Sequence, residues 1–220
     1  MTYGAMALVI GVVNAKGGSG KTTLATNVAR AIQLDGNDVA LVDTDPQKTA
    51  ATWGQNQPDG YGLPVRHVES ADQTKSLQKC IKSLIGDADI GVIDGSAKIA
   101  EGTGAAVGAS DVVLIPIQPT PADTWGARSV VEVIKKTGTT AAFVISRQIV
   151  GTNLAKEVAG GLEGYGLPVF ESRTSQRVAY AEAMFEGKTV LDVSGAGKAE
   201  TEIQGITSEL AQLLRSRQRG

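Results

Sequence analysis

Short apolar runs rich in β-branched residues recur along the chain, and segments with helical periodicity separate them. Two of the runs, Ala40 to Val42 and Val112 to Ile115, are apolar at every position, as strands covered on both faces are. Strands that alternate with helices indicate a parallel sheet with right-handed crossovers. We therefore predict the fold class α/β, a doubly wound, mostly parallel sheet with helices on both faces. The expected strands lie at 7–13, 38–43, 64–68, 89–94, 111–117 and 140–146.

The helix expected after the first strand carries Leu24, Val28 and Ile32 on one stripe, and Gly36 offers a left-handed end. The stretch 54–63 is rich in Gly, Pro and Asn, which predicts a surface connection. The 220 residues suffice for one full sheet but not for a second domain beside it, and no repeat or linker divides them. We expect a single domain over residues 1–220.

The segment 14–23 reads Asn-Ala-Lys-Gly-Gly-Ser-Gly-Lys-Thr-Thr and lies between the first strand and the first helix. Phosphates need converging backbone N–H groups, glycines that let the backbone approach, and a lysine and a hydroxyl for the terminal phosphates and magnesium. Ala15 replaces a glycine of the common motif, and a second lysine, Lys16, stands five residues before Lys21. The alternative for Thr23 is a bond within its own helix. The predicted nucleotide-binding residues of this loop are Lys16, Gly17, Gly18, Ser19, Gly20, Lys21, Thr22 and Thr23.

Three aspartates lie at the ends of predicted strands. Asp43 and Asp45 flank Thr44, and strand alternation places both carboxylates on one face. The alternative for this Asp-Thr-Asp-Pro run is a polar turn whose aspartates cap the backbone. Asp94 ends another strand, and magnesium binds few carboxylates because it keeps several of its waters. Ligands of such sheets bind at the carboxyl ends of the strands, so all three aspartates are expected beside the phosphate loop.

Composition excludes several classes of function. One cysteine allows no internal disulfide and too few thiolates for an iron–sulfur ATPase, and one histidine allows no metal cluster or catalytic triad. A net charge of −2 excludes a protein that is basic throughout, although it leaves room for a local basic face. No run of 18 apolar residues occurs and the start carries no basic leader, so we expect a cytoplasmic protein without a membrane partner.

From the phosphate loop onward the chain resembles the ParA/MinD family of ATPases, whose variant loop reads K-G-G-x-G-K-[ST]. The triplet Ser175-Gln176-Arg177 extends the resemblance to the short plasmid-partition branch exemplified by ParF. The resemblance implies a P-loop NTPase fold of the ParA/MinD type over nearly the whole chain. The other segments that carry it are Val42-Asp43-Thr44-Asp45-Pro46-Gln47, Ile90-Gly91-Val92-Ile93-Asp94-Gly95 and Ile115-Pro116-Ile117-Gln118-Pro119-Thr120-Pro121.

The resemblance also implies ATP and Mg²⁺ as cofactors and a role for each residue of the site. Lys21 would hold the β and γ phosphates, and the Thr22 hydroxyl would ligate magnesium. Asp45 corresponds to the aspartate that positions the attacking water, while Asp43 lies toward the magnesium shell. Asp94, in the Walker B position, would reach magnesium through a water. The implied reaction is a slow, partner-stimulated hydrolysis of ATP to ADP and phosphate.

Lys16 is expected to act in catalysis together with Lys21 and Asp45. In the family this lysine reaches across a nucleotide-sandwich dimer to the partner subunit's phosphates. Pro116 belongs to a segment that the resemblance places beside the nucleotide and the dimer seam, a rigid turn being the alternative. Many relatives have a proline soon after the Walker B aspartate, and this chain has Gly95-Ser96-Ala97 instead. The switch expected at 95–104 should therefore move differently.

The implied function is that of a positioning ATPase that forms an ATP-dependent homodimer, binds nonspecific DNA and associates with the nucleoid. A small ParB-like adaptor would stimulate hydrolysis, and the cargo would be a plasmid, a carboxysome or another large complex. The candidate DNA contacts are Arg177, Lys188 and Arg215, although scattered basic residues are usually a solvated face.

Two other functions remain open. A MinD-like membrane-surface ATPase would use an amphipathic C-terminal helix. The apolar stripe that includes Ile203, Ile206 and Leu210 fits such a helix, but nearby glutamates and the lack of a large aromatic residue favour packing on its own domain. A metabolic enzyme on the same scaffold, such as a cobyrinate amidase, has no need of Lys16.

Overall fold

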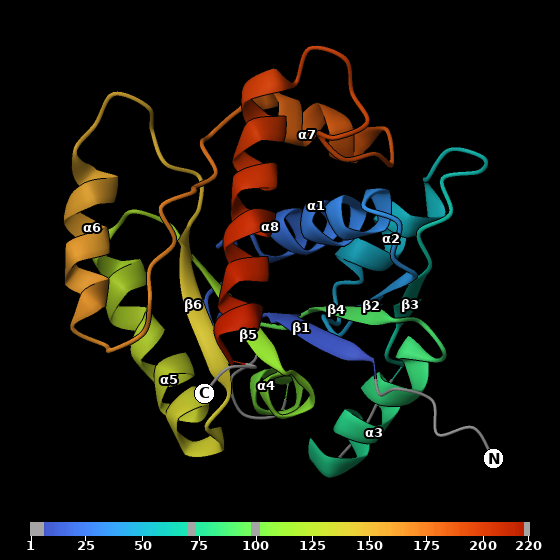
Figure 1. Cartoon of the computed structure of the whole chain (residues 1–220), viewed down its shortest axis with the longest axis horizontal. Coiled ribbons are helices and arrows are strands. Elements are labelled where there is room, and N and C mark those ends of the chain that lie inside the picture. Colours follow the sequence, from blue (N-terminus) through green and yellow to red (C-terminus); the bar gives the residue numbers. More distant parts are fainter. Residues whose placement is uncertain (1–6, 70–73, 98–101, 218–220) are drawn as a thin grey trace.

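The computed structural model describes residues 7–69, 74–97 and 102–217. In these residues six parallel strands form one sheet in the order β3-β2-β4-β1-β5-β6 (Figure 1). The predicted fold class is confirmed, and every predicted strand is present within one or two residues of its expected ends. The strands are β1 Leu8–Val12, β2 Val39–Asp43, β3 Val65–His67, β4 Ile90–Asp94, β5 Val112–Ile117 and β6 Thr140–Ile145.

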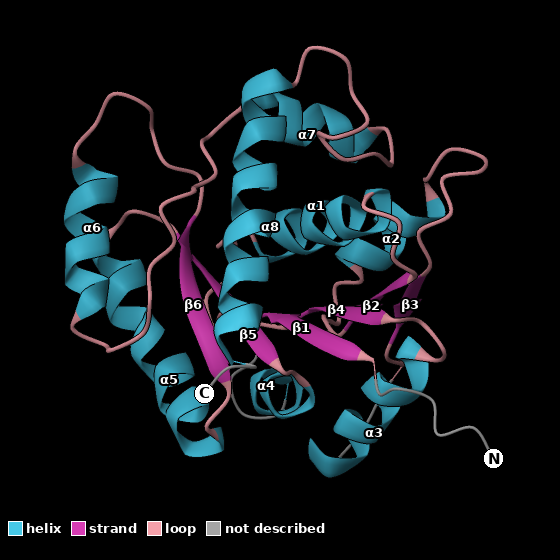
Figure 2. Cartoon of the chain, viewed as in Figure 1, coloured by secondary structure: helices cyan, strands magenta, loops and turns pink. Residues whose placement is uncertain are grey.

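Helices cover both faces of the sheet (Figure 2). Each face has its own apolar core. Along β5 the side chains alternate between the two cores, with Leu114 in one and Ile115 in the other. One face carries α1 Lys21–Leu34, α2 Thr49–Gln55, α7 Val178–Phe185 and α8 Gly197–Arg217. The opposite face carries α3 Thr74–Ile85, α4 Gly104–Ala109, α5 Pro121–Thr137 and α6 Leu154–Glu163.

β5 continues through Pro116 to Ile117, in agreement with the strand predicted over 111–117. Pairing with β1 ends at Leu114, so the missing N–H of Pro116 removes no ladder bond on that side, and its carbonyl accepts a bond from the Asn14 side chain instead. The surface connection expected from residue 54 begins only after Gln55, because α2 includes that residue.

The outer edge of β6 is covered by a segment that periodicity does not reveal. The backbone N–H of Phe170 donates to Phe143, and that of Thr174 donates to Ile145, at 2.9 and 3.0 Å. Residues 168–176 thus follow β6 with parallel bridges but without a continuous ladder. Covering the edge in this way removes a row of unpaired backbone groups from solvent.

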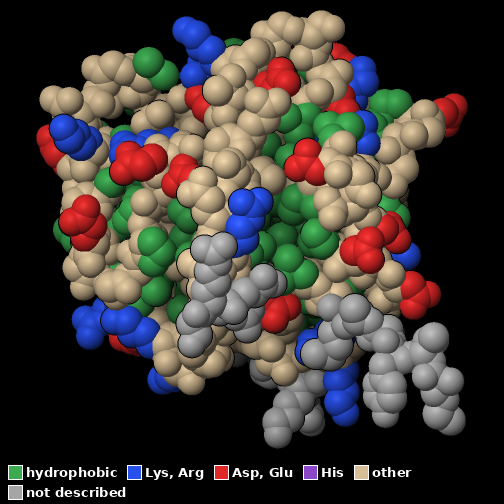
Figure 3. Space-filling view, in the orientation of Figure 1, with side chains coloured by type: hydrophobic (Ala, Val, Ile, Leu, Met, Phe, Trp, Pro, Cys, Tyr) green, Lys and Arg blue, Asp and Glu red, His purple; other side chains and the backbone are tan. Residues whose placement is uncertain are grey.

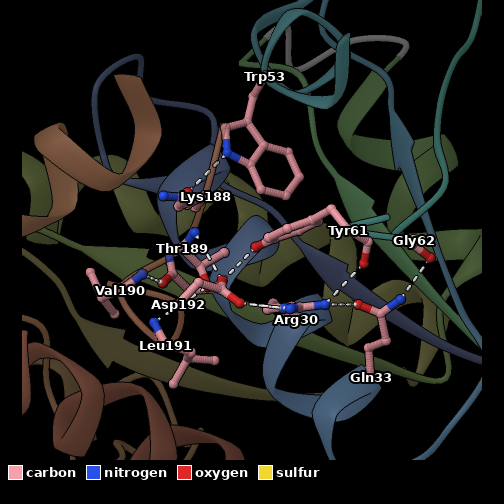
Figure 4. A network of polar contacts seen from close by, with 11 residues as sticks. Arg30, Gln33, Trp53, Tyr61, Gly62, Lys188, Thr189, Val190, Leu191 and Asp192 are labelled. Carbon is pink, nitrogen blue, oxygen red and sulfur yellow. Dashed lines mark hydrogen bonds and ion pairs between the residues drawn. The ribbon is translucent and has the colours of Figure 1, made fainter. Parts of the chain in front are cut away.

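A polar network joins α1 to the turn after α7 (Figure 4). Asp192 accepts hydrogen bonds from Arg30 at 2.6 Å, from the Tyr61 hydroxyl at 2.6 Å and from the Thr189 hydroxyl at 2.6 Å. Trp53 donates to the Lys188 carbonyl in the same region. Burial acts to raise the pKa of Asp192, but the hydrogen bonds from these three side chains outweigh it and lower the pKa below its usual value.

Asp192→Ala should lower the free energy of unfolding by about 1–3 kcal/mol, because it leaves the largely buried Arg30 guanidinium without its carboxylate. Glu132→Gln is the matched control, since its partner Arg128 is 78% exposed and the expected change is below about 0.5 kcal/mol. Urea denaturation at neutral pH measures both variants. Equal losses in the two would show that the network contributes nothing specific.

Candidate functional site

The phosphate loop joins the end of β1 to the start of α1. Gly18 and Gly20 adopt the left-handed region with φ of 75° and 93°, a conformation that other residues adopt only with strain. Gly20 is also the N-cap of α1, where no side chain among the described residues caps the helix. The first N–H groups of α1 therefore face the loop, as a phosphate-binding helix terminus requires.

Three side chains from neighbouring strand ends hold the loop in shape. Asn14 donates to the Pro116 carbonyl at 2.7 Å, Gln118 to the Gly18 carbonyl at 2.5 Å, and Ser146 to the Ser19 carbonyl at 2.6 Å. None of the three was predicted as a site residue. Gln118 and Ser146 directly follow β5 and β6, and Asn14 lies two residues after the end of β1, so position at the carboxyl end of a strand was the signal available in the sequence.

The predicted residues Lys21, Thr22 and Asp94 lie close together at the end of the phosphate loop. The Thr22 hydroxyl donates to Asp94 Oδ2 at 2.7 Å, and the Lys21 ammonium donates to the Lys16 carbonyl at 3.0 Å. Asp94 is 1% exposed, and its Oδ1 atom has no hydrogen-bond partner among the described residues. Burial raises the pKa of Asp94 to about 7 and lowers the pKa of Lys21.

These residues fit a magnesium ion. Asp94 offers an unsatisfied buried oxygen beside the Thr22 hydroxyl, and magnesium prefers such oxygens together with waters and substrate phosphates. The described residues contain no group of three or more His, Cys, Asp or Glu able to hold a metal.

Asp43 and Asp45 lie at the end of β2 in different environments. Asp43 is fully buried, and its two oxygens accept the N–H groups of Asp45 and Ala51 at 2.9 Å each. It therefore caps the turn and the start of α2, as the alternative of a capped polar turn expects. Burial raises its pKa despite these two bonds. Asp45 is partly exposed, and the intervening Thr44 hydroxyl donates to the Asp94 carbonyl at 2.9 Å.

Lys16 points away from the Lys21 pocket and toward α5. Its ammonium lies 2.5 Å from Asp123 Oδ2, and its side chain is 43% exposed. The two lysines of the loop therefore occupy different environments, Lys21 inside the site and Lys16 at its rim. The predicted switch at 95–104 includes residues 98–101, which lie outside the described residues.

The structure does not bring the three candidate DNA-binding residues together on one surface. Arg177 pairs with Glu202 at 2.6 Å and Lys188 with Glu186 at 2.8 Å, while Arg215 is exposed near the C-terminal end of α8, far from α7 (Figure 1). Figure 3 shows Lys and Arg side chains dispersed among acidic ones on the visible face. A DNA-binding role for these three residues stays a prediction.

Residues 10–190 match the family of the CobQ/CobB/MinD/ParA nucleotide binding domain. The chain belongs to this ParA/MinD family. It is 29% identical over 214 residues to the maintenance of carboxysome distribution protein A of Halothiobacillus neapolitanus, covering 93% of this chain and 96% of that one. The predicted family is thus confirmed.

Solved structures of the ParA/MinD type share the fold. The ATP complex of Cyanothece McdA superposes with a TM-score of 0.78 at 16% identity, over 94% of this chain and 98% of that chain. Cobyrinic acid a,c-diamide synthase from Mycobacterium smegmatis, with bound ADP and magnesium, superposes with a TM-score of 0.65 at 20% identity, over 82% and 93%. Among the described residues, none of the helices combines the length and apolar character that a bilayer-spanning segment needs.

Asp94→Asn should stabilise the nucleotide-free and magnesium-free protein by about 2–4 kcal/mol at pH 8.5, since it removes a buried charge. The folded-state pKa is raised, so the folded state binds the proton more tightly and wild-type stability falls as pH rises from about 4 to about 7. The gain should shrink at pH 5.5. Denaturation in EDTA at both pH values measures it, with the exposed Asp59→Asn as control. A gain independent of pH would contradict the raised pKa.

Proposed function

We propose that this chain is an ATPase of the ParA/MinD positioning type that uses bound ATP to form a sandwich homodimer. The observation that supports this proposal is the loop with two lysines. Lys21 is 7% exposed and lies inside the site, while Lys16 lies at its rim. A single lysine suffices to hold a nucleotide within one subunit. A second lysine at the rim would supply positive charge to a partner's nucleotide.

The chemistry needs positioning and charge more than covalent catalysis. Lys21 and the N-terminus of α1 would hold the phosphates, and Thr22 with Asp94 would hold magnesium, which supplies charge neutralisation when bound. Asp45 would orient the attacking water from the end of β2. Lys16 of the partner subunit would add positive charge where negative charge develops, as an arginine finger does.

The dimer would be isologous, so the same face of both copies meets and each Lys16 reaches the other copy's nucleotide. We propose further that the dimer binds nonspecific DNA and that a small ParB-like adaptor stimulates hydrolysis and release. The relative from Halothiobacillus neapolitanus is named for carboxysome distribution, which supports a large cargo of that kind or a plasmid. Two copies double the number of cations on one face, and this compensates for the acidic single subunit.

The membrane-surface alternative has less support. Ile203, Ile206 and Leu210, the stripe that would enter the lipid, are at most 2% exposed and pack in the core beside α1. An apolar stripe buried in its own domain is not available to a bilayer. The metabolic alternative shares the fold with the cobyrinic acid a,c-diamide synthase, and the role of Lys16 distinguishes it from the positioning ATPase.

Lys16→Ala should keep the affinity for ATP within about tenfold yet lose ATP-dependent dimerisation, because its charge acts on the partner subunit. Lys21→Ala should lose nucleotide binding itself. Asp45→Ala should bind ATP but not hydrolyse it, and it serves as the background in which the dimer persists. Nucleotide titration and light scattering with ATP and magnesium measure these properties. A dimer that persists without Lys16 would rule out the sandwich and favour the metabolic enzyme.

DNA binding should require ATP and be independent of base sequence. If roughly four to six phosphates are engaged, the affinity should fall with salt on a log–log slope of about −4 to −5. Filter binding across a salt series with ATP and with ADP measures the slope, and Arg215→Ala with Lys188→Ala tests the candidate contacts. Equal binding with both nucleotides would falsify the nucleoid-carrier function.

A further inference from the structure

The lysine at the rim of the loop is bound within its own subunit. Lys16 Nζ contacts Asp123 Oδ2 at 2.5 Å, across 107 positions of sequence that separate the phosphate loop from α5. Asp123 lies in the first turn of α5, where the Thr120 side chain caps the helix by accepting the Asp123 N–H at 3.1 Å. The ion pair therefore ties the phosphate loop to the start of this helix.

Asp123 depends on Lys16 for compensation of its charge. Its side chain has no exposed surface, and its Oδ1 atom has no hydrogen-bond partner among the described residues. The Thr120 hydroxyl donates to Oδ2, and in the part of the chain that the structure describes Lys16 is the one cation in an ion pair with this carboxylate. Departure of Lys16 would leave a buried carboxylate without a counter-charge, which is strongly unfavourable.

The surroundings allow Lys16 to leave without a change in the fold. An open hollow of about 460 Å³ adjoins Lys16 and is lined on its other side by Trp125, Arg128 and Glu132. The Lys16 carbonyl accepts the Lys21 ammonium at 3.0 Å. A phosphate that attracts the Lys21 ammonium would therefore also remove one of the bonds that hold the Lys16 backbone.

We propose that Asp123 is a positioning residue that holds Lys16 against α5 in the single subunit and opposes its transfer to a partner's phosphates. The inference rests on the proposed function, because it assigns an opposing contact to the lysine of the sandwich dimer. The two phosphate-bearing sites of a dimer offer Lys16 a stronger anionic partner than Asp123 alone. ATP would therefore be required both to bring the subunits together and to outweigh the Asp123 contact.

The first test measures dimerisation in the Asp45→Ala background with ATP and magnesium. Asp123→Asn keeps the shape of the side chain and removes its charge, so the protein concentration at half-dimerisation should fall by roughly tenfold or more. Glu132→Gln makes the same change of net charge in the hollow beside Lys16 and leaves the ion pair in place. This control should stay within about twofold of its parent.

The second test uses the nucleotide-free subunit and a double-mutant cycle followed by urea denaturation. Lys16→Ala alone should destabilise the subunit, because it leaves Asp123 uncompensated. Asp123→Asn should raise the stability of the Lys16→Ala variant. It should not raise the stability of the subunit that keeps Lys16. This arm remains informative if Asp123→Asn alone folds poorly, since an unchanged stability of Lys16→Ala would by itself overturn the proposal.

The outcomes separate this inference from the proposed function. If the Asp45→Ala parent dimerises with ATP and Asp123→Asn leaves the midpoint unchanged or raises it, the holding role of Asp123 is wrong and the sandwich dimer stands. If the parent stays monomeric with ATP, the sandwich dimer is wrong and the opposing role of Asp123 is lost with it. An equal shift in Glu132→Gln would assign the effect to net charge and overturn the role of Asp123.

Discussion

Parallel pairing of β1 with both β4 and β5 determines where the candidate residues of the nucleotide site lie. The register aligns Val12 with Asp94 on one side and with Leu114 on the other, and it aligns Asp43 with Asp94 one strand further. All these strands run in the same direction, so their carboxyl ends meet at one edge. Residues that are far apart in sequence thereby become neighbours of the phosphate loop, which needs their side chains to keep its shape.

Without a ligand, this arrangement leaves the buried charges of the site only partly compensated. Asp94 and Lys21 are both buried, and burial shifts their pKa values toward the neutral forms. The hydrogen bond from Thr22 and the charges of Lys21 and Asp94 on each other offset only part of that cost. A cation and phosphates would supply the missing compensation, so binding of ligand and stability of the fold are linked at this edge.

Features that depend on neighbouring residues in sequence could be predicted, and features that depend on chain crossings could not. The six strands and the helix that carries Leu24 and Val28 follow from local periodicity, and the phosphate loop follows from a contiguous motif. The bonds from Gln118 and Ser146 to the loop require the sheet order, which no local pattern encodes. The contact of Asp123 with Lys16 could not be predicted, because nothing in the sequence places it beside a lysine 107 positions away.

Burial of Asp123 determines how firmly the rim lysine is held. An ion pair between exposed side chains contributes little and weakens further with salt, because water and ions screen both charges. Lys16 is 43% exposed, but the Asp123 side chain has no exposed surface, so only one end of the pair is screened. If Lys16 acts on another subunit as proposed, it is held until then by a carboxylate that solvent cannot satisfy. The contact would oppose closure at ordinary ionic strength and would give way only to a denser negative charge, such as the phosphates of a nucleotide.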